Sequence, residues 1–479
     1  MALASLHGAQ RQPASPSTGD RPPRRGLILA TLSACMVMVA IDTSAVNVAL
    51  DDMQAELNMS IGELAWVINA YTLTWACLTP VGGRIGDLRG RRGGLLGGAT
   101  VFVAASIASG MAPNAAMVIA ARTVQGAGAA FMFPANLALV SATFPDRERP
   151  RAIATLITVV GGGQAAGPLI GGALVETLGW RALFFINLPI GAVAIFYGLR
   201  LVPRSRADSE DRSIDWIGAA LITSGLVGLV VAIDQSDGWP IAATLAVAGA
   251  GVVLLAVFVI VEYRVNRPLI GPELLTNRNV QALNLAGIAM FFTFLPTLMY
   301  GALLVQNIFG YSAVEAGAAL VPFVLPIALI ARPAAALAER WDTAKVMSLG
   351  YVCIVVGLGA FALLLSEDMS IVAVLVPLSI AGLGFGTCIA LISSTVVGSV
   401  SPDDAGTASG ANFAIRLIGG TIGVAIVTNV FDGRGGGTDV EPTVFVDAVR
   451  PAFVLLAIVA AVGLAINVGF VRDDRRLAP

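Results

Sequence analysis

The chain alternates between long runs of apolar residues and short polar segments. A run of about 18 or more apolar residues predicts a helix that crosses a bilayer. Successive runs of this kind predict fourteen transmembrane helices. Their predicted ranges are Gly26–Leu50, Gly62–Gly83, Gly94–Met111, Ala115–Ala142, Ala152–Glu176, Ala182–Val202, Ile214–Ala232, Ile241–Glu262, Val280–Gln306, Ser312–Arg332, Ala344–Leu365, Ile371–Val400, Ala405–Asn429 and Asp447–Val471.

The composition agrees with this pattern. Hydrophobic residues make up 56% of the chain and charged residues 13%, and the mean hydropathy is +0.82. A soluble domain carries about 25% charged residues, far more than this chain. The alternating strands of an outer-membrane barrel are also absent from the sequence. We therefore predict an all-α polytopic membrane protein with fourteen transmembrane helices.

Basic residues are concentrated in the segments on one side of the predicted helices. Those segments carry Arg84, Arg89, Arg91, Arg92, Arg147, Arg149, Arg151, Arg200, Arg204, Arg206, Arg212, Arg264, Arg267, Arg278, Arg332, Arg340, Lys345, Arg472, Arg475 and Arg476. The opposite segments hold only Arg181, Arg434 and Arg450. By the positive-inside rule, both termini are expected in the cytoplasm of a multi-pass protein of the cell membrane.

A faint internal repeat divides the chain. The order of small, apolar, acidic and basic residues in Gly83–Arg89 recurs in Ala335–Arg340. We expect six-helix bundles at residues 26–205 and 276–479, with a two-helix insert at 206–275 between them. Two related bundles around a midplane site are typical of transporters. The polar, proline-rich residues 1–25 are expected to be a disordered cytoplasmic tail, and a short cytoplasmic tail should end the chain.

Two charged residues are predicted deep inside helices. Asp42 lies about 12 Å from the outer end of the first helix, and Arg122 lies at a similar depth in the fourth. A charge in the hydrocarbon core costs roughly 2.5–3.5 kcal/mol on insertion scales and usually marks an ion or substrate path. We predict a conditional, proton-coupling pair, with a permanent structural ion pair as the alternative. Gln125 lies on the same face of the fourth helix as Arg122, and this face carries polar or small residues.

Two further segments are candidates for gating. Gly163, Gly167 and Gly171 line one face of the fifth helix, where Pro168 should bend it. We predict a hinge or gate there, with plain helix packing as the alternative. The loop around Asp87 is expected to form a charge latch with Arg332 or Arg340, and the alternative is a simple positive-inside anchor. The candidate gating residues are Gly83, Asp87, Gly90, Arg91, Arg92, Gly163, Gly167, Pro168, Gly171 and Gly172.

These motifs resemble the fourteen-helix drug–proton antiporter branch of the major facilitator superfamily, from about Gly26 to Val471. Gly83…Asp87…Gly90-Arg91-Arg92 is similar to its loop 2–3 signature, but Leu88 follows the acid and the basic residue comes at Arg89. Matches also occur at Arg122…Gln125-Gly126, at Gly163…Gly167-Pro168…Gly171-Gly172, at Trp180–Gly191 and at Asp42-Thr43…Leu50, where Asp51 replaces a common proline. The resemblance implies export and a role of Arg122 in proton transfer.

We therefore expect a proton-coupled antiporter that exports small amphipathic compounds by alternating access. Uptake of a nutrient by the same fold, a membrane-embedded enzyme and a channel are the alternatives. We expect no cofactor, no metal and no nucleic-acid partner, and a monomer driven by the proton gradient; the one histidine, His7, lies in the tail. The expected substrate-binding residues are Trp66, Asn69, Tyr71, Trp75, Gln125, Asn136, Gln164 and Phe292.

Overall fold

The computed structural model describes residues 25–145, 148–205, 215–235, 239–265, 277–399, 405–437 and 440–471. Within these ranges every regular element is a helix. Hydrocarbon offers no partner to a free N–H or C=O group, and a helix bonds these groups within its own segment. The predicted tails, with His7 and with Arg472, Arg475 and Arg476, lie outside the described residues apart from Arg25, which begins the first helix.

The helices match the fourteen predicted ones in number and order. The first bundle contains α1 (Arg25–Ala45), η1 (Val46–Ala49), α2 (Leu50–Leu57), α3 (Ile61–Arg89), α4 (Arg91–Gly110), α5 (Ala115–Thr143), α6 (Arg149–Leu178), α7 (Ala182–Phe185) and α8 (Asn187–Leu201). The insert contains α9 (Trp216–Asp234) and α10 (Ile241–Glu262). The second bundle contains α12 (Arg278–Phe309), α13 (Ala313–Arg340), α14 (Thr343–Leu364), α15 (Ile371–Gly398), α16 (Ala405–Asp432) and α17 (Pro442–Phe470).

Two predicted boundaries were wrong in an informative way. The Gly83–Leu95 segment, predicted as a loop, is helical on both sides of one residue, Gly90. Gly90 has a φ of 117°, which a residue with a Cβ rarely adopts. The first predicted helix is also divided, because α1 gives way to the 3₁₀ turn η1 just after Asp42.

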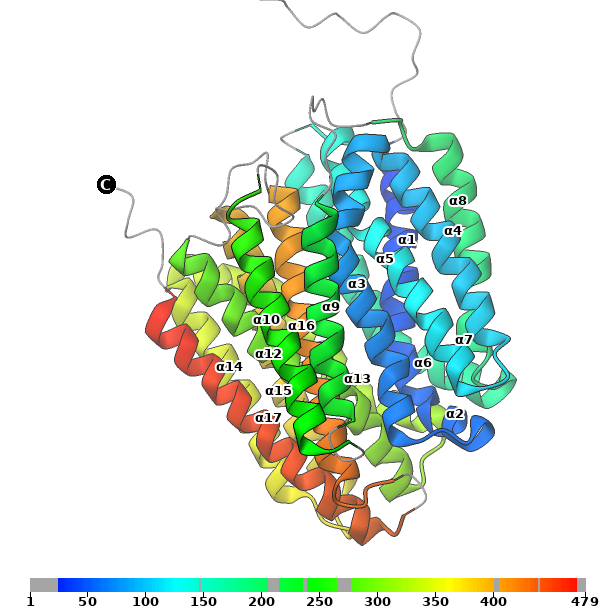
Figure 1. Cartoon of the computed structure of the whole chain (residues 1–479), viewed down its shortest axis with the longest axis vertical. Coiled ribbons are helices and arrows are strands. Elements are labelled where there is room, and N and C mark those ends of the chain that lie inside the picture. The colour runs from blue at the N-terminus through cyan, green and yellow to red at the C-terminus, as the bar shows by residue number, and fades with distance from the viewer. Residues whose placement is uncertain are drawn as a thin grey trace, which may run out of the picture.

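Helices from the two bundles lie against each other along two seams. α6 packs on α13, and α3 packs on α16. The insert helix α9 contacts both α3 and α16 and thus covers the second seam from outside, while α10 packs on α9 (Figure 1). Asn429 of α16 donates to the carbonyl of Ile233 on α9 at 3.3 Å. The insert therefore touches both halves of the molecule.

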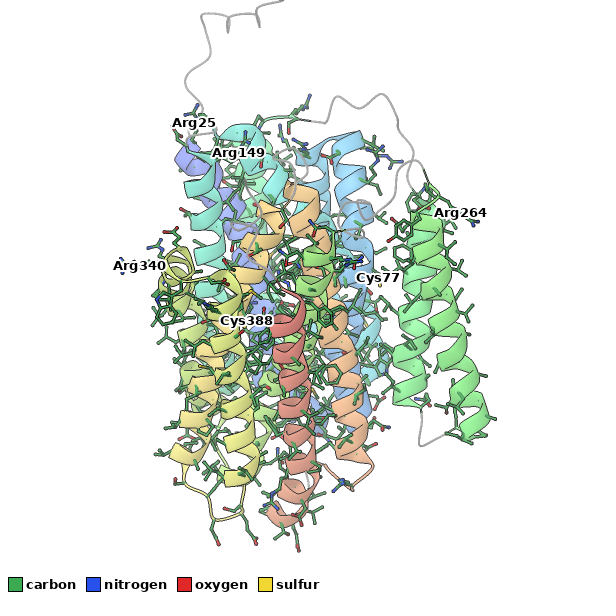
Figure 2. All side chains as sticks on the ribbon, turned by 90° about the vertical axis from the view of Figure 1, so that its left-hand side faces the viewer. Arg25, Cys77, Arg149, Arg264, Arg340 and Cys388 are labelled. Atoms are coloured by element: carbon green, nitrogen blue, oxygen red, sulfur yellow. The ribbon has the colours of Figure 1, made fainter. Side chains whose placement is uncertain are left out.

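Chain direction defines two ends of the molecule. α1 and α17 begin and finish at the same end, which we call the basic end because Arg25, Arg149 and Arg264 gather there (Figure 2). Thirteen of the helices in the described ranges are long and apolar enough to cross a membrane, and the thirty-residue α6 is the remaining long helix. The observed helices confirm the predicted fold class.

Topology can be tested with single cysteines. Arg434 follows α16 at the end opposite the basic end and is exposed, whereas Lys345 is exposed in the first turn of α14 at the basic end. If the basic end faces the cytoplasm, a membrane-impermeant maleimide should label Arg434→Cys in intact cells. Lys345→Cys should be labelled only after permeabilisation. The reverse pattern would mean that the basic end faces outward. Labelling of both residues from outside would contradict the predicted number of membrane-spanning helices.

Candidate functional site

The carboxylate of Asp42 lies at the centre of a buried hydrogen-bond network. Arg122 Nη1 donates to Asp42 Oδ2 at 2.6 Å, and Gln125 Nε2 donates to Asp42 Oδ1 at 2.8 Å. Asn187 Nδ2 donates to the same Oδ1 at 3.2 Å. The side chains of Arg122 and Asp42 are only 1% and 2% exposed. Three donors around two oxygens suit an ionised carboxylate, because a protonated one would direct its own O–H at one of them.

Arg122 is also held by a second helix. Its Nε donates to the carbonyl of Val67 on α3 at 3.1 Å, and its guanidinium lies 4.1 Å from the ring centroid of Tyr71, also on α3. Nη1 further donates to Gln125 Oε1 at 2.9 Å. The ion pair therefore links α1 to α5, while Arg122 keeps independent contacts with α3.

Asn187 was not among the predicted site residues, although it lies in the Trp180–Gly191 motif. Its Nδ2 bridges Asp42 and the hydroxyl of Ser106, which in turn donates to the carbonyl of Phe184 at 2.8 Å. Asn187 and Ser106 are fully buried. An amide inside an otherwise apolar run was the available signal, because such a group needs a polar partner.

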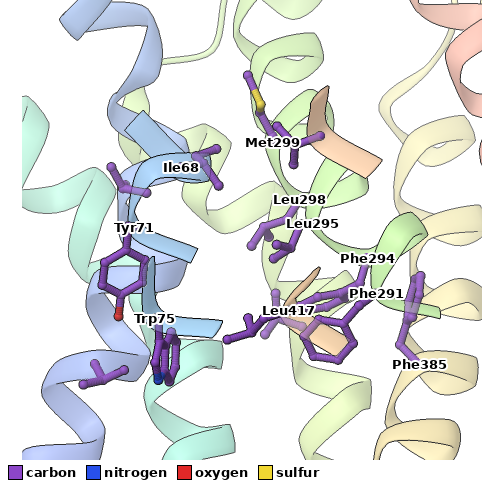
Figure 3. Packing of buried hydrophobic residues seen from close by; sticks show 14 of the residues in the cluster. Ile68, Tyr71, Trp75, Phe291, Phe294, Leu295, Leu298, Met299, Phe385 and Leu417 are labelled. Atoms are coloured by element: carbon purple, nitrogen blue, oxygen red, sulfur yellow. The ribbon is translucent and has the colours of Figure 1, made fainter. Parts of the chain in front are cut away.

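A cluster of aromatic rings closes the space between the two bundles on the side of Asp42 that faces the basic end. Trp75 of α3 lies 4.9 Å from the ring of Phe413 on α16, and Phe133 of α5 stacks on Phe413 at 4.5 Å. Phe291 of α12 completes the cluster, 6.4 Å from Phe413. Figure 3 shows Trp75 on one bundle and Phe291 on the other, while the Tyr71 ring lies beside Trp75 and contacts Arg122 and Phe102 inside the first bundle. These rings form a candidate gate.

The predicted binding residues are only partly brought together. Tyr71 and Trp75 are neighbours, with ring centroids 5.5 Å apart. Asn136 is buried and donates to the carbonyl of Leu32 at 2.8 Å, within the first bundle. The aromatic cluster uses Phe291 rather than the predicted Phe292. Three further predicted residues, the buried Asn69 and the partly buried Trp66 and Gln164, lie outside this cluster of rings.

The glycines of α6 form close helix contacts on two sides. A Cβ on Gly163 would lie 3.1 Å from that of Ala40, and one on Gly167 would collide with Ser44 Oγ. A Cβ on Gly171 would lie 2.9 Å from that of Ala45. This face therefore packs directly on α1, as the predicted groove requires.

The other face of α6 packs on the second bundle. A Cβ on Gly172 would collide with the carbonyl oxygen of Ala313, and the oxygen of Pro168 occupies the corresponding space beside Gly317. Near the same end, Ser312 Oγ donates to Glu176 at 3.0 Å. α6 is thus packed closely between α1 and α13.

The expected latch partner of Asp87 was wrong in this conformation. Asp87 Oδ1 forms an ion pair with Arg91 Nε at 2.8 Å, within the first bundle, rather than with Arg332 or Arg340. The i, i+4 spacing across the junction of α3 and α4 brings the two side chains together without any contribution from the other bundle. Arg91 N and Arg92 Nη2 bond to carbonyls of Ser205 and Leu199, so this junction is tied to the end of α8. A Cβ on Gly83 would lie 3.3 Å from the Cβ of Pro134 on α5.

A second buried arginine was missed. Arg416 lies eleven residues after the start of α16 and is 4% exposed. Its guanidinium is 5.4 Å from the Phe291 ring centroid and 5.7 Å from that of Phe413. Its depth in the predicted thirteenth helix was the signal that could have found it, by the same rule that singled out Asp42 and Arg122.

Comparison with known sequences settles the family. The sequence profile of the Major Facilitator Superfamily matches residues 32–424. The chain belongs to this superfamily. The cephamycin export protein of Amycolatopsis lactamdurans is a 33% identical superfamily relative over 467 residues, which cover 95% of this chain and 94% of the relative. The puromycin resistance protein of Streptomyces alboniger is 34% identical, covering 86% of this chain and 82% of the relative.

Solved superfamily structures share the fold. A bacterial homologue of the human lysosomal transporter Spinster superposes with a TM-score of 0.65 at 15% identity, covering 94% of this chain and 97% of that chain. A bacterial homologue of the human drug peptide transporters PepT1 and PepT2 gives 0.65 at 16% identity, with 95% and 100% covered. These likenesses confirm the superfamily fold predicted from the sequence.

The glycine face of α6 can be tested by overpacking. Gly167→Leu should abolish transport while the protein still reaches the membrane, because the side chain would push α6 away from Ser44 on α1. Overpacking of this kind typically costs about 1–3 kcal/mol. Gly162→Leu is the matched control, since nothing lies within 4 Å of a Cβ at Gly162. The measurement is the resistance conferred on a pump-deficient host, normalised to membrane-inserted protein. Normal resistance from Gly167→Leu, or equal loss from both variants, would contradict a specific contact.

Proposed function

We propose that this member of the superfamily exports small amphipathic compounds, such as antibiotics, in exchange for protons. The observation that carries the proposal is the buried network around Asp42, in which one titratable carboxylate is placed between helices that belong to the transport machinery. The names of the relatives support the choice of substrates: cephamycin export, puromycin resistance and multidrug resistance in Mycobacterium tuberculosis.

The exchange is proposed to begin at the ion pair. When Asp42 takes up a proton, its attraction to Arg122 is lost, because a neutral carboxyl no longer balances the guanidinium. Arg122, on α5, keeps its bond to Val67 and its contact with Tyr71, so α5 stays linked to α3. The link that weakens is the one between α1 and α5.

The loosened α1 can then pass the change to the bundle interface. α1 packs on the glycines of α6, and the opposite face of α6 packs on α13. A shift of α1 is therefore proposed to move α6 against the second bundle and to favour opening toward the side that releases substrate. Deprotonation of Asp42 toward the cytoplasm restores the ion pair and the starting state.

A proton gradient supplies enough energy for this cycle. One elementary charge moved across 100 mV is worth about 2.3 kcal/mol, and about 1.4 kcal/mol corresponds to a tenfold concentration ratio. One proton can thus sustain a substrate gradient of roughly forty-fold before any pH difference is added. The proposal needs no cofactor, and it treats the chain as a transporter without enzymatic turnover.

Asp42→Asn should abolish proton-driven transport while the protein still inserts, because asparagine keeps the shape but cannot exchange a proton at working pH. The measurement uses everted vesicles from a pump-deficient host, energised by respiration, with puromycin and cefoxitin as trial substrates. Uptake by Asp42→Asn vesicles should fall to that of empty-vector vesicles, while downhill exchange of substrate should proceed without a gradient.

The matched control is Asp368→Asn, which makes the same substitution at an exposed carboxylate between α14 and α15. Its uptake should equal that of the wild type. Proton-driven uptake that survives Asp42→Asn would move the coupling site elsewhere. Uptake that runs only into right-side-out vesicles would favour nutrient import over export.

A further inference from the structure

Arg416 is a buried cation with no counter-ion among the residues that the structure describes. Its Nε and Nη1 atoms are buried and make no hydrogen bond, and no carboxylate of the described residues forms an ion pair with it. This differs from Arg122, whose charge is balanced by Asp42 at 2.6 Å. The two arginines are similarly buried, but only the charge of Arg122 is balanced by a neighbouring carboxylate.

An unpaired buried charge is costly, since neither water nor an opposite charge replaces its lost hydration. Packing alone does not account for a guanidinium here, because an apolar side chain could contact Phe291 and Phe413 without that cost. A group retained with free donors in the core of a transporter is expected to meet its partner during part of the cycle. The partner must be an acceptor that arrives from outside the protein, and an anion best satisfies the charge.

Further unused polar atoms lie in the same region. Trp75 Nε1 is a buried donor without a partner, and the Trp75 ring contacts Phe413 at 4.9 Å. Asn412, one turn before Arg416 on α16, donates to Asn284 Oδ1 at 2.7 Å but leaves its own Oδ1 buried and unbonded. The free donors come from both bundles, and the rings of the aromatic cluster lie between them.

We infer that Arg416 and the surrounding rings form a binding subsite for the anionic group of a substrate that joins a carboxylate to an aromatic or apolar ring system. The guanidinium would hold the carboxylate, in which two parallel N–H···O bonds are the favoured geometry. Trp75 Nε1 offers a third donor from the first bundle, and Phe291 and Phe413 provide surfaces for the ring system. This inference rests on the proposed export function and narrows its substrate class.

The subsite is connected to the proton site by a row of contacts. Arg416 lies over Phe413, Phe413 contacts Trp75, Trp75 contacts Tyr71, and Tyr71 lies against Arg122. A ligand that displaces Trp75 from Phe413 would disturb the ring against which Arg122 rests. Binding at Arg416 and proton exchange at Asp42 can therefore influence each other without touching the same residue.

The test compares cefoxitin, which carries an aromatic ring and a carboxylate, with its neutral methyl ester. Binding of both to the purified full-length protein is measured by equilibrium dialysis without a proton gradient. The wild type should bind the acid about tenfold or more tightly than the ester, in the range expected for a charge-assisted hydrogen bond. Arg416→Gln should lose this preference by weakening the acid alone. Arg416→Lys, which keeps the charge but loses the two-pronged geometry, should retain part of it.

Two controls separate binding from stability and from net charge. Lys345→Gln removes one exposed positive charge at the basic end and should leave the preference unchanged. The thermal unfolding midpoint of ligand-free Arg416→Gln should equal or exceed that of the wild type, because an unpaired charge is removed. Equal binding of acid and ester by the wild type, no binding of either, or an unchanged preference in Arg416→Gln would overturn the subsite and leave proton-coupled export standing. A lower midpoint with loss of both ligands would assign Arg416 a structural role instead.

Different results would contradict the binding subsite at Arg416 and the proton coupling at Asp42. Asp42→Asn should keep the preference for the acid, because any effect of this substitution on binding is shared by the acid and the ester, which differ only in the group that meets Arg416. An intact preference together with proton-independent export would contradict the coupling at Asp42 and leave the subsite at Arg416 in place.

Discussion

The ion pair between Asp42 and Arg122 is the interaction around which the first bundle is organised. Both side chains are almost fully buried, and loss of one partner from such a pair typically destabilises a protein by about 3–5 kcal/mol. The side-chain amides of Gln125 and Asn187 donate hydrogen bonds to Asp42 Oδ1, the carboxylate oxygen that Arg122 does not contact. Because an ion pair needs an ionised carboxylate, the proposed uptake of a proton by Asp42 would change how α1 is held.

Close backbone contact gives that change a mechanical effect. Larger side chains between α1 and α6 could absorb a small movement by changing rotamers. Gly163, Gly167 and Gly171 place the α6 backbone directly against α1, and Gly172 places the same helix against α13. Since tightly packed interfaces change by discrete steps rather than by continuous deformation, the proposed movement of α1 would be passed to the boundary between the bundles.

Much of this arrangement could be predicted from sequence because the bilayer restricts the choices. The lengths of the apolar runs define fourteen helices, and equal depth along two of them brings Asp42 and Arg122 together. Helix ends were less predictable. α3 and α13 continue through charged residues to Arg89 and Arg340, where hydropathy falls but the helix persists because its charged side chains can reach the interface.

The rotation of a helix about its axis could not be predicted in the same way. One residue corresponds to about 100° around a helix, so Phe291, which joins the aromatic cluster, and the predicted Phe292 lie on different faces of α12. α12 is apolar on nearly all sides and buried over most of its length, which leaves no polar face to settle its orientation. The partners of Asp87 were unpredictable for a different reason: a surface charge at a helix junction has several arginines within reach, and the nearest is in its own bundle.

The placement of the two buried arginines in different bundles bears on how exchange could work. If one carboxylate served both proton and substrate, the two would compete directly for it. Here the carboxylate and its arginine lie in the first bundle, while Arg416 lies in the second, and the rings of Tyr71, Trp75 and Phe413 span the distance between them. In the proposed exchange, proton and substrate would then compete through the relative position of the two bundles, and the same movement would open and close the path. Under the proposed mechanism the proton site would not have to recognise the substrate, so substrates of varied shape could be accepted.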